Sequence, residues 1–305
     1  MEYRAGSCDE RPDSFTYTSL IKAWTKSNII GYEEKCLQIL RWMEDNDVVG
    51  MNRIAYNEAM KAFSRSSRED AGDMAGGVYN QLISRYQRTH DRQFCPDKFT
   101  YMTLINAYSR NCSTHETALE AEKVLFDMME SNVIPDNKLC NIVIAAWARS
   151  GSQESIYHAE EICNRMDALG INIDGVCFNS LINVYATSND PERGVWAFKV
   201  LDRMKERGAR PTSVTYTILF TACQDDQELL MQVFDSTITD GMLDEKLKDS
   251  FKDHGPSCLQ EQLREGNINH EWSRNANRGP VSSTRKWNTK RGSTGADVRQ
   301  FSWAR

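Results

Sequence analysis

The chain has 305 residues with 40% hydrophobic and 26% charged content, as expected of a folded protein with a hydrophobic core. No stretch approaches the roughly 18 consecutive apolar residues of a membrane span, so no membrane partner is expected. The formal net charge is −6, with −11 in residues 1–254 and +5 in residues 255–305, which argues against nucleic-acid binding by overall charge alone.

The nine cysteines include no Cys-x-x-Cys pair, which argues against a zinc site of that spacing. Buried free thiols in a reducing compartment account for them. The sequence therefore indicates no metal ion and no cofactor.

An apolar residue followed by aromatic-x-x-Leu or Ile recurs along the chain. The six copies read PDSFTYTSLIKAW, MNRIAYNEAMKAF, PDKFTYMTLINAY, PDNKLCNIVIAAW, IDGVCFNSLINVY and PTSVTYTILFTAC. They recur every 38 to 45 residues, a spacing that indicates a repeat protein. After their first two letters, the copies begin at Ser14, Arg53, Lys98, Asn137, Gly175 and Ser213.

Each copy predicts two helices. The first carries apolar residues at helical spacing, such as Tyr17, Leu20 and Ile21. The second ends in a methionine followed by a break that contains Gly or Pro. A single hairpin cannot bury its apolar face, so stacked neighbours are expected to form a solenoid with the methionines in its core. These methionines are Met43, Met128, Met166 and Met204.

The pattern divides the chain into segments. Residues 1–13 are expected to be the end of a partial repeat, so the chain is either truncated at its start or opens with an unusual cap. The repeats are expected at 14–52, 53–97, 98–136, 137–174 and 175–212, with a degenerate one at 213–244. Residues 245–305 are expected to hold a short capping helix and, after Gly255, a mostly disordered basic tail.

The second copy fits the pattern least well. The segment SSREDAGDMAGG interrupts it, and Leu82 stands in place of the methionine. The copies are long for two helices and a turn, and the extra residues are expected mainly between the two helices of a repeat, as in SRNCSTHETALE, where they loop out.

Repeats that open with TYxxLI, carry a late methionine and close with Pro-Asp resemble the pentatricopeptide repeat family over about residues 14–244. The resemblance implies an all-α fold, a right-handed superhelical solenoid of helix-turn-helix repeats. It implies sequence-selective binding of single-stranded RNA at one base per repeat, without catalysis. It also implies an adaptor in mitochondrial or plastid RNA processing, stability or translation, alongside other RNA-processing proteins.

In this family, two side chains of each repeat read the base: the residue after the aromatic of the first helix, and the last residue of the repeat. Asn and Thr can donate or accept hydrogen bonds, whereas ionised Asp only accepts. Met102 can do neither, so the third base preference is left unspecified. Carried over, the pairs are Thr18 with Asn52, Asn57 with Asp97, Met102 with Asp136, Asn141 with Asp174, Asn179 with Thr212, and Thr217 with Asp244, the last partner being an open assignment. In the family, N-terminal repeats meet the 5′ end of the RNA, and the code associates Thr-Asn with adenine, Asn-Asp with uracil and Asn-Thr weakly with pyrimidines. The resemblance therefore implies the base order A-U-N-U-Y for the first five copies, with N unspecified and Y a pyrimidine.

Cations lie four and eight residues after several of these readers, on the same helix face. We call them the basic stripe and expect them to bind phosphates along the concave surface. The alternative is an ordinary helix end, where the dipole favours cations. The stripe consists of Lys22, Lys26, Lys61, Arg65, Arg110 and Arg149.

An apolar residue near the start of each repeat resembles the family's base-sandwiching position, although packing between repeats explains it as well. Copy four has Lys138 there. The others are Phe15, Ile54, Phe99, Val176 and Val214.

His158-Ala159-Glu160 matches half of a zinc deaminase motif, but the missing Cys-x-x-Cys leaves it predicted as surface helix. No enzyme activity is therefore expected. The rival function is a protein-binding scaffold of helical repeats, which the acidic body favours.

Overall fold

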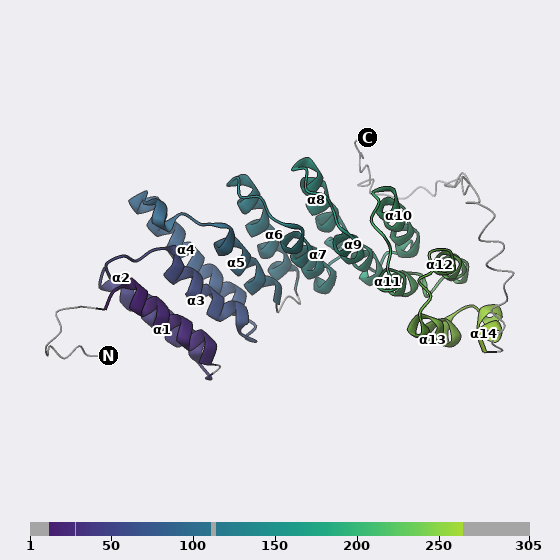
Figure 1. Cartoon of the computed structure of the whole chain (residues 1–305), viewed down its shortest axis with the longest axis horizontal. Helices are drawn as coiled ribbons and strands as arrows, with labels where there is room; N and C mark the ends of the chain where they lie inside the picture. The colour runs from purple at the N-terminus through teal and green to yellow at the C-terminus, as the bar shows by residue number, and fades with distance from the viewer. Residues whose placement is uncertain (1–11, 28, 111–113, 265–305) are drawn as a thin grey trace.

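The computed structural model describes residues 12–27, 29–110 and 114–264, and this part of the chain is helical, with no strand. The hairpins follow one another in an elongated row from α1 at one end to α13 and α14 at the other (Figure 1). This confirms the all-α solenoid. In chain order the elements are α1 Ser14–Ser27, α2 Tyr32–Asp45, α3 Arg53–Arg65, α4 Ala71–Thr89, the 3-10 helix η1 Arg92–Phe94, α5 Lys98–Arg110, α6 His115–Glu130, α7 Asn137–Ser150, α8 Ser155–Ala168, α9 Gly175–Thr187, α10 Arg193–Glu206, α11 Ser213–Cys223, α12 Gln227–Thr239, α13 Glu245–His254 and α14 Ser257–Arg264.

The helices form two layers. The first helices of the hairpins (α1, α3, α5, α7, α9 and α11) each contact the next in the series, which makes one continuous layer. The second helices (α2, α4, α6, α8, α10 and α12) pack against the first helix of their own hairpin. Several of them, among them α4, α6 and α10, also contact the first helix of the next hairpin. Side chains at equivalent places on the first helices therefore lie in rows along the solenoid.

Local side-chain chemistry determines where the first helices begin. The side-chain oxygen of the residue before the helix accepts a hydrogen bond from a backbone N–H of the first turn. This N–H would otherwise lack a partner. The capping residues and the residues that they cap are Asn52 with Ile54, Asp97 with Thr100, Asp136 with Leu139, Asp174 with Val176 and Cys177, and Thr212 with Thr215.

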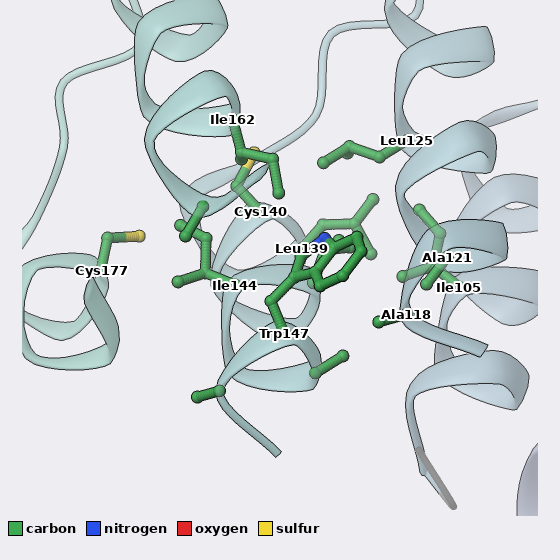
Figure 2. Packing of buried hydrophobic residues seen from close by; sticks show 14 of the residues in the cluster. Ile105, Ala118, Ala121, Leu125, Leu139, Cys140, Ile144, Trp147, Ile162 and Cys177 are labelled. Carbon is green, nitrogen blue, oxygen red and sulfur yellow. The ribbon is translucent and has the colours of Figure 1, made fainter. Parts of the chain in front are cut away.

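The core runs between the two layers. The four methionines at the ends of second helices are fully buried, and so is Leu82 in the matching place of the second hairpin. Figure 2 shows the core around Trp147 of α7, whose ring points toward Ala118 and Ala121 of α6. Burying a side chain of this size stabilises the fold by about 1.5–3 kcal/mol.

The second hairpin differs from the expectation. The segment 66–77 does not interrupt the pattern, because α4 already begins at Ala71. Gly72 and Gly76 allow the ring of Tyr108 to lie where a Cβ atom would otherwise be. The extra residues of this hairpin lie in its long second helix, the 19-residue α4, and in the loop with η1 that follows it, and not between the two helices.

The C-terminal end also differs from the expectation, since an additional helix, α14, follows Gly255. Leu259 and Leu263 are four residues apart and buried, and α14 packs against α13. Two apolar residues in a polar segment gave too short a pattern to predict a helix. The expectations for residues 1–11 and for the tail from residue 265 lie outside the described residues. None of the described helices is long and apolar enough to cross a membrane.

Candidate nucleic-acid interface

The candidate readers lie on the layer of first helices. Asn57 is almost fully buried, and the others are half-buried. Because α3, α5 and α7 are consecutive in this layer, their readers follow one another along the solenoid. The half-buried readers are Thr18, Met102, Asn141, Asn179 and Thr217.

A groove of about 760 Å³ crosses three repeats on this layer and is lined by residues of α3, α5 and α7. It brings four members of the basic stripe together with Phe99 and the readers Met102 and Asn141. Lys22 and Lys26 lie on α1 and do not line it. The four cations in the groove are Lys61, Arg65, Arg110 and Arg149.

Two of these cations also connect neighbouring repeats. Arg110 Nη1 donates to the backbone oxygen of Ser64 at 3.1 Å, and Arg149 Nη2 donates to that of Ser109 at 2.7 Å. Both acceptors lie in the last turn of the preceding first helix, where carbonyls lack helical partners and the dipole favours cations. The structure thus shows the helix-end role for these two arginines. Each guanidinium carries five N–H donors, which leaves it able to bind an anion as well.

The stripe ends after the fourth repeat, and the structure shows what replaces it. At the equivalent place of the next repeat, Thr187 Oγ1 donates to the backbone oxygen of Ala148 at 3.2 Å. One repeat further on, Asp225 forms an ion pair with Arg193. The connection between repeats therefore continues without a cation that faces the groove.

The asparagine readers differ in what their side chains bind. The Oδ1 atoms of Asn57 and Asn141 are buried and have no hydrogen-bond partner among the described residues. In contrast, Asn179 Oδ1 accepts a hydrogen bond from Thr215 Oγ1 at 2.7 Å. A buried polar atom without a partner costs about 1–3 kcal/mol, so Asn57 and Asn141 have hydrogen-bonding capacity that the protein alone does not satisfy.

The candidate readers at the ends of the repeats have a structural role that the sequence interpretation missed. They are the N-caps described above, and Asp244 caps α13 in the same way through the backbone N–H of Leu247. The signal was present, because Asp, Asn or Thr directly before an apolar periodic segment is a helix-start pattern.

The apolar residues at the sandwich position are not hidden by packing between repeats. All five are exposed, from 38% for Phe99 to 79% for Phe15. These side chains are therefore available for contact with a ligand. Lys138 interrupts this row and is exposed too.

His158 and Glu160 do not form a surface helix face, which corrects the sequence prediction. The His158 ring stacks on the Trp147 ring, with 4.1 Å between the ring centroids. Nδ1 of His158 lies 2.7 Å from Oε2 of Glu122. Glu160 is buried and accepts hydrogen bonds from the Tyr185 hydroxyl and from Arg203. Core packing between repeats explains both residues.

Most cysteines in the described part of the chain are buried, namely Cys36, Cys140, Cys163, Cys177 and Cys223, whereas Cys258 is exposed. Burial raises the pKa of Cys140, Cys163 and Cys223 to about 12, so these thiols stay neutral at physiological pH. Among the residues that the structure describes, no group of three or more His, Cys, Asp or Glu side chains could hold a metal ion.

The comparisons agree with this architecture. The model of the PPR repeat family matches residues 173–225. A mitochondrial pentatricopeptide repeat-containing protein of Arabidopsis thaliana is 28% identical over 54% of this chain, and a chloroplastic one is 27% identical over 61%. The chain spans 18% and 22% of their lengths.

Among solved structures, the maize pentatricopeptide repeat protein PPR10 matches 84% of this chain and 40% of its own, with 22% identity and a TM-score of 0.48. That protein was also crystallised in complex with an 18-nt RNA element. The six copies of the sequence pattern, the layered series of helical hairpins, the family model over residues 173–225 and the curated relatives together support a pentatricopeptide repeat protein.

Proposed function

We propose that the protein binds single-stranded RNA along its layer of first helices, with one nucleotide at each repeat and without catalysis of its own. The observation that carries the proposal is the groove across α3, α5 and α7. Four cations, an exposed aromatic ring and an asparagine with an unsatisfied buried oxygen line it together.

The chemistry of this groove suits a single strand better than a duplex. Cations in a row neutralise successive phosphates, and exposed apolar side chains stack on unpaired bases. The base edges remain for the readers on the first helices and the capping residues next to them, in the pairs given by the family resemblance. A duplex hides these edges in its grooves, so it cannot use the same contacts.

The groove also answers the objection from net charge. An acidic body can bind RNA when its cations gather on one surface, because the local field decides where an anion is attracted. Lys61, Arg65, Arg110 and Arg149 meet this condition. A protein scaffold does not require four cations and an exposed row of base-sized apolar side chains on one layer.

The cellular role is proposed from the relatives. Their names refer to mitochondria and chloroplasts, and one relative, 22% identical over 208 residues, is the Arabidopsis small ribosomal subunit protein mL103. These names support an adaptor that acts on RNA inside an organelle, in processing, stability or translation. RNA-processing proteins of the same compartment are the further partners proposed.

The test is a binding titration of the full chain with three fluorescent ligands of equal length: a single-stranded RNA, an RNA hairpin and a single-stranded DNA. We expect saturable binding that is tightest for the single-stranded RNA and weakens as salt rises. Equal binding of all three, or none of any, would replace this proposal by the protein scaffold.

A further inference from the structure

In the second and third repeats, the first residue lies beside the last residue of the same repeat, although about 40 positions separate the two in the chain. In the second repeat, Arg53 Nε lies 2.8 Å from Asp97 Oδ2. In the third repeat, Lys98 Nζ lies 3.2 Å from Asp136 Oδ2. The same pairing therefore occurs twice in the same register.

The fourth repeat has the same reader pair as the second repeat but no such cation. Its first residue is Asn137, whose Nδ2 donates to the backbone oxygen of Asn172 at 2.8 Å. Its last residue, Asp174, has no Lys or Arg within ion-pair distance among the described residues. The pairs Asn57 with Asp97 and Asn141 with Asp174 are thus chemically alike but differently surrounded.

Asp97 and Asp174 differ in the hydrogen bonds that their two carboxylate oxygens accept. A carboxylate has about four acceptor sites. Asp97 Oδ1 accepts from the backbone N–H and the hydroxyl of Thr100, and its Oδ2 accepts from Arg53. Asp174 Oδ1 accepts from the N–H groups of Val176 and Cys177, and no cation occupies its Oδ2.

The pKa values of the two acids that are paired with a cation, Asp97 and Asp136, agree with this arrangement. Burial acts to raise the pKa of Asp97, but the hydrogen bonds from Thr100 and from Arg53 outweigh it and hold the pKa below its usual value. Burial also acts to raise the pKa of Asp136, and the Leu139 N–H together with Lys98 lowers it overall. In both, the negative charge is compensated inside the repeat.

We propose that the first residue of a repeat controls how far its last residue takes part in base reading: Arg53 and Lys98 withhold Asp97 and Asp136, whereas Asn137 leaves Asp174 available. This rests on the proposed RNA binding. Uracil presents an N–H at N3 and cytosine presents an acceptor there. An available carboxylate therefore favours uracil, and a neighbouring cation reduces that preference. The fourth repeat discriminates uracil from cytosine more strongly than the second.

The experiment is a reciprocal exchange, Arg53→Asn and Asn137→Arg, in the full chain. Each variant is titrated with single-stranded RNAs of core A-U-N-U-Y that carry uracil or cytosine at the second or the fourth position. The readout is the ratio of the two dissociation constants at each position. The added or lost charge changes affinity for both RNAs alike and cancels in this ratio.

Arg53→Asn is expected to raise the uracil preference at the second position about three- to fivefold, the effect of a partly exposed ion pair, and to leave the fourth unchanged. Asn137→Arg is expected to lower the preference at the fourth position by a similar factor. Lys123→Gln on α6 controls for net charge, and Asn137→Gln controls for loss of the hydrogen bond to Asn172. Thermal melting followed by circular dichroism verifies that each variant is folded.

Unchanged ratios in variants that bind RNA would overturn the inference and leave the proposed function intact. A lower uracil preference in Arg53→Asn would also overturn it, because Arg53 would then read the base itself. If the unaltered protein binds no RNA, the proposed function fails, and the inference fails with it.

Discussion

Replacing Lys26, Arg65, Arg110 and Arg149 by Gln should weaken RNA binding regardless of sequence and flatten its dependence on salt. These cations occupy the same place in the first four repeats, and the last three line the groove. Each phosphate contact on a single strand contributes about 0.7 to the slope of log affinity against log salt. Four contacts contribute about 2.8, so between about 50 and 200 mM salt the unaltered protein should lose roughly 50-fold more affinity than the variant.

The structure defines the control that this experiment needs. Arg110 and Arg149 also donate to carbonyls of the preceding repeat, and each such bond contributes about 0.5–1.5 kcal/mol to stability. Replacing Arg65, Arg110 and Arg149 by Lys keeps the charge and alters this hydrogen bonding. It should preserve most of the salt slope while lowering the melting temperature slightly.

A second control removes the same charge from the layer of second helices. There the exposed cations do not line the groove. The assay is fluorescence anisotropy with one single-stranded RNA over a series of salt concentrations. If the Gln variant keeps the slope of the unaltered protein, or if the control variant flattens it equally, the stripe is only a solvated helix edge. The control replaces Lys35, Arg41, Lys123 and Lys199 by Gln.

Three further predictions concern stability. Removing residues 265–305 should leave the melting temperature unchanged. A cut after Gly255 also removes α14 and should lower the melting temperature, since the two buried leucines of α14 contribute about 1.5–3 kcal/mol each. Equal melting temperatures of the two truncated proteins would show that α14 does not support the fold. Asp97→Asn should lower the free energy of unfolding in urea at pH 7, because the pKa of Asp97 is lower in the folded protein than its ordinary value of 3.8. The difference should shrink as the pH falls below 3.8 and through the folded-state pKa, and a difference that does not change with pH would contradict the ion pair and the cap. Trp147→Ala should cost about 3–5 kcal/mol, since this residue is fully buried between repeats, and a cost below about 1 kcal/mol would contradict the packing.

The fold could be predicted because each level of the sequence agrees with the next. Apolar residues at helical spacing, a methionine before each break and an N-capping residue before most first helices all indicate the same hairpin. The first helices accordingly begin at Ser14, Arg53, Lys98, Asn137, Gly175 and Ser213, where the pattern places the start of each copy.

The parts that were not predicted depend on contacts between distant residues. Gly72 and Gly76 look like a break in the sequence, yet they lie in a helix because Tyr108 fills the space beside them. In the same way, His158 looks like half of a catalytic motif until Trp147 is placed against its ring. Sequence spacing carries no information on such partners.

The candidate interface was predictable only in outline. Spacing places the readers and the basic stripe on the first helices, but it does not show that Arg110 and Arg149 also bind carbonyls of the preceding repeat. Nor does it show that Arg53 pairs with Asp97, since the two residues are 44 positions apart. These contacts decide which donors and acceptors remain for a ligand.

The central claim, that the pairs of readers select bases, is tested most directly by selection from a random RNA pool with the unaltered protein and with Asn57→Thr, Asp97 being kept. Asn57 is buried with an unsatisfied oxygen, and the smaller threonine fits the same space. Under the family's code, the unaltered protein should enrich A-U-N-U-pyrimidine, and the variant should change the second base from uracil toward guanine. The same enriched sequence for both proteins, or no enrichment by either, would contradict base reading by these residues and favour the protein scaffold.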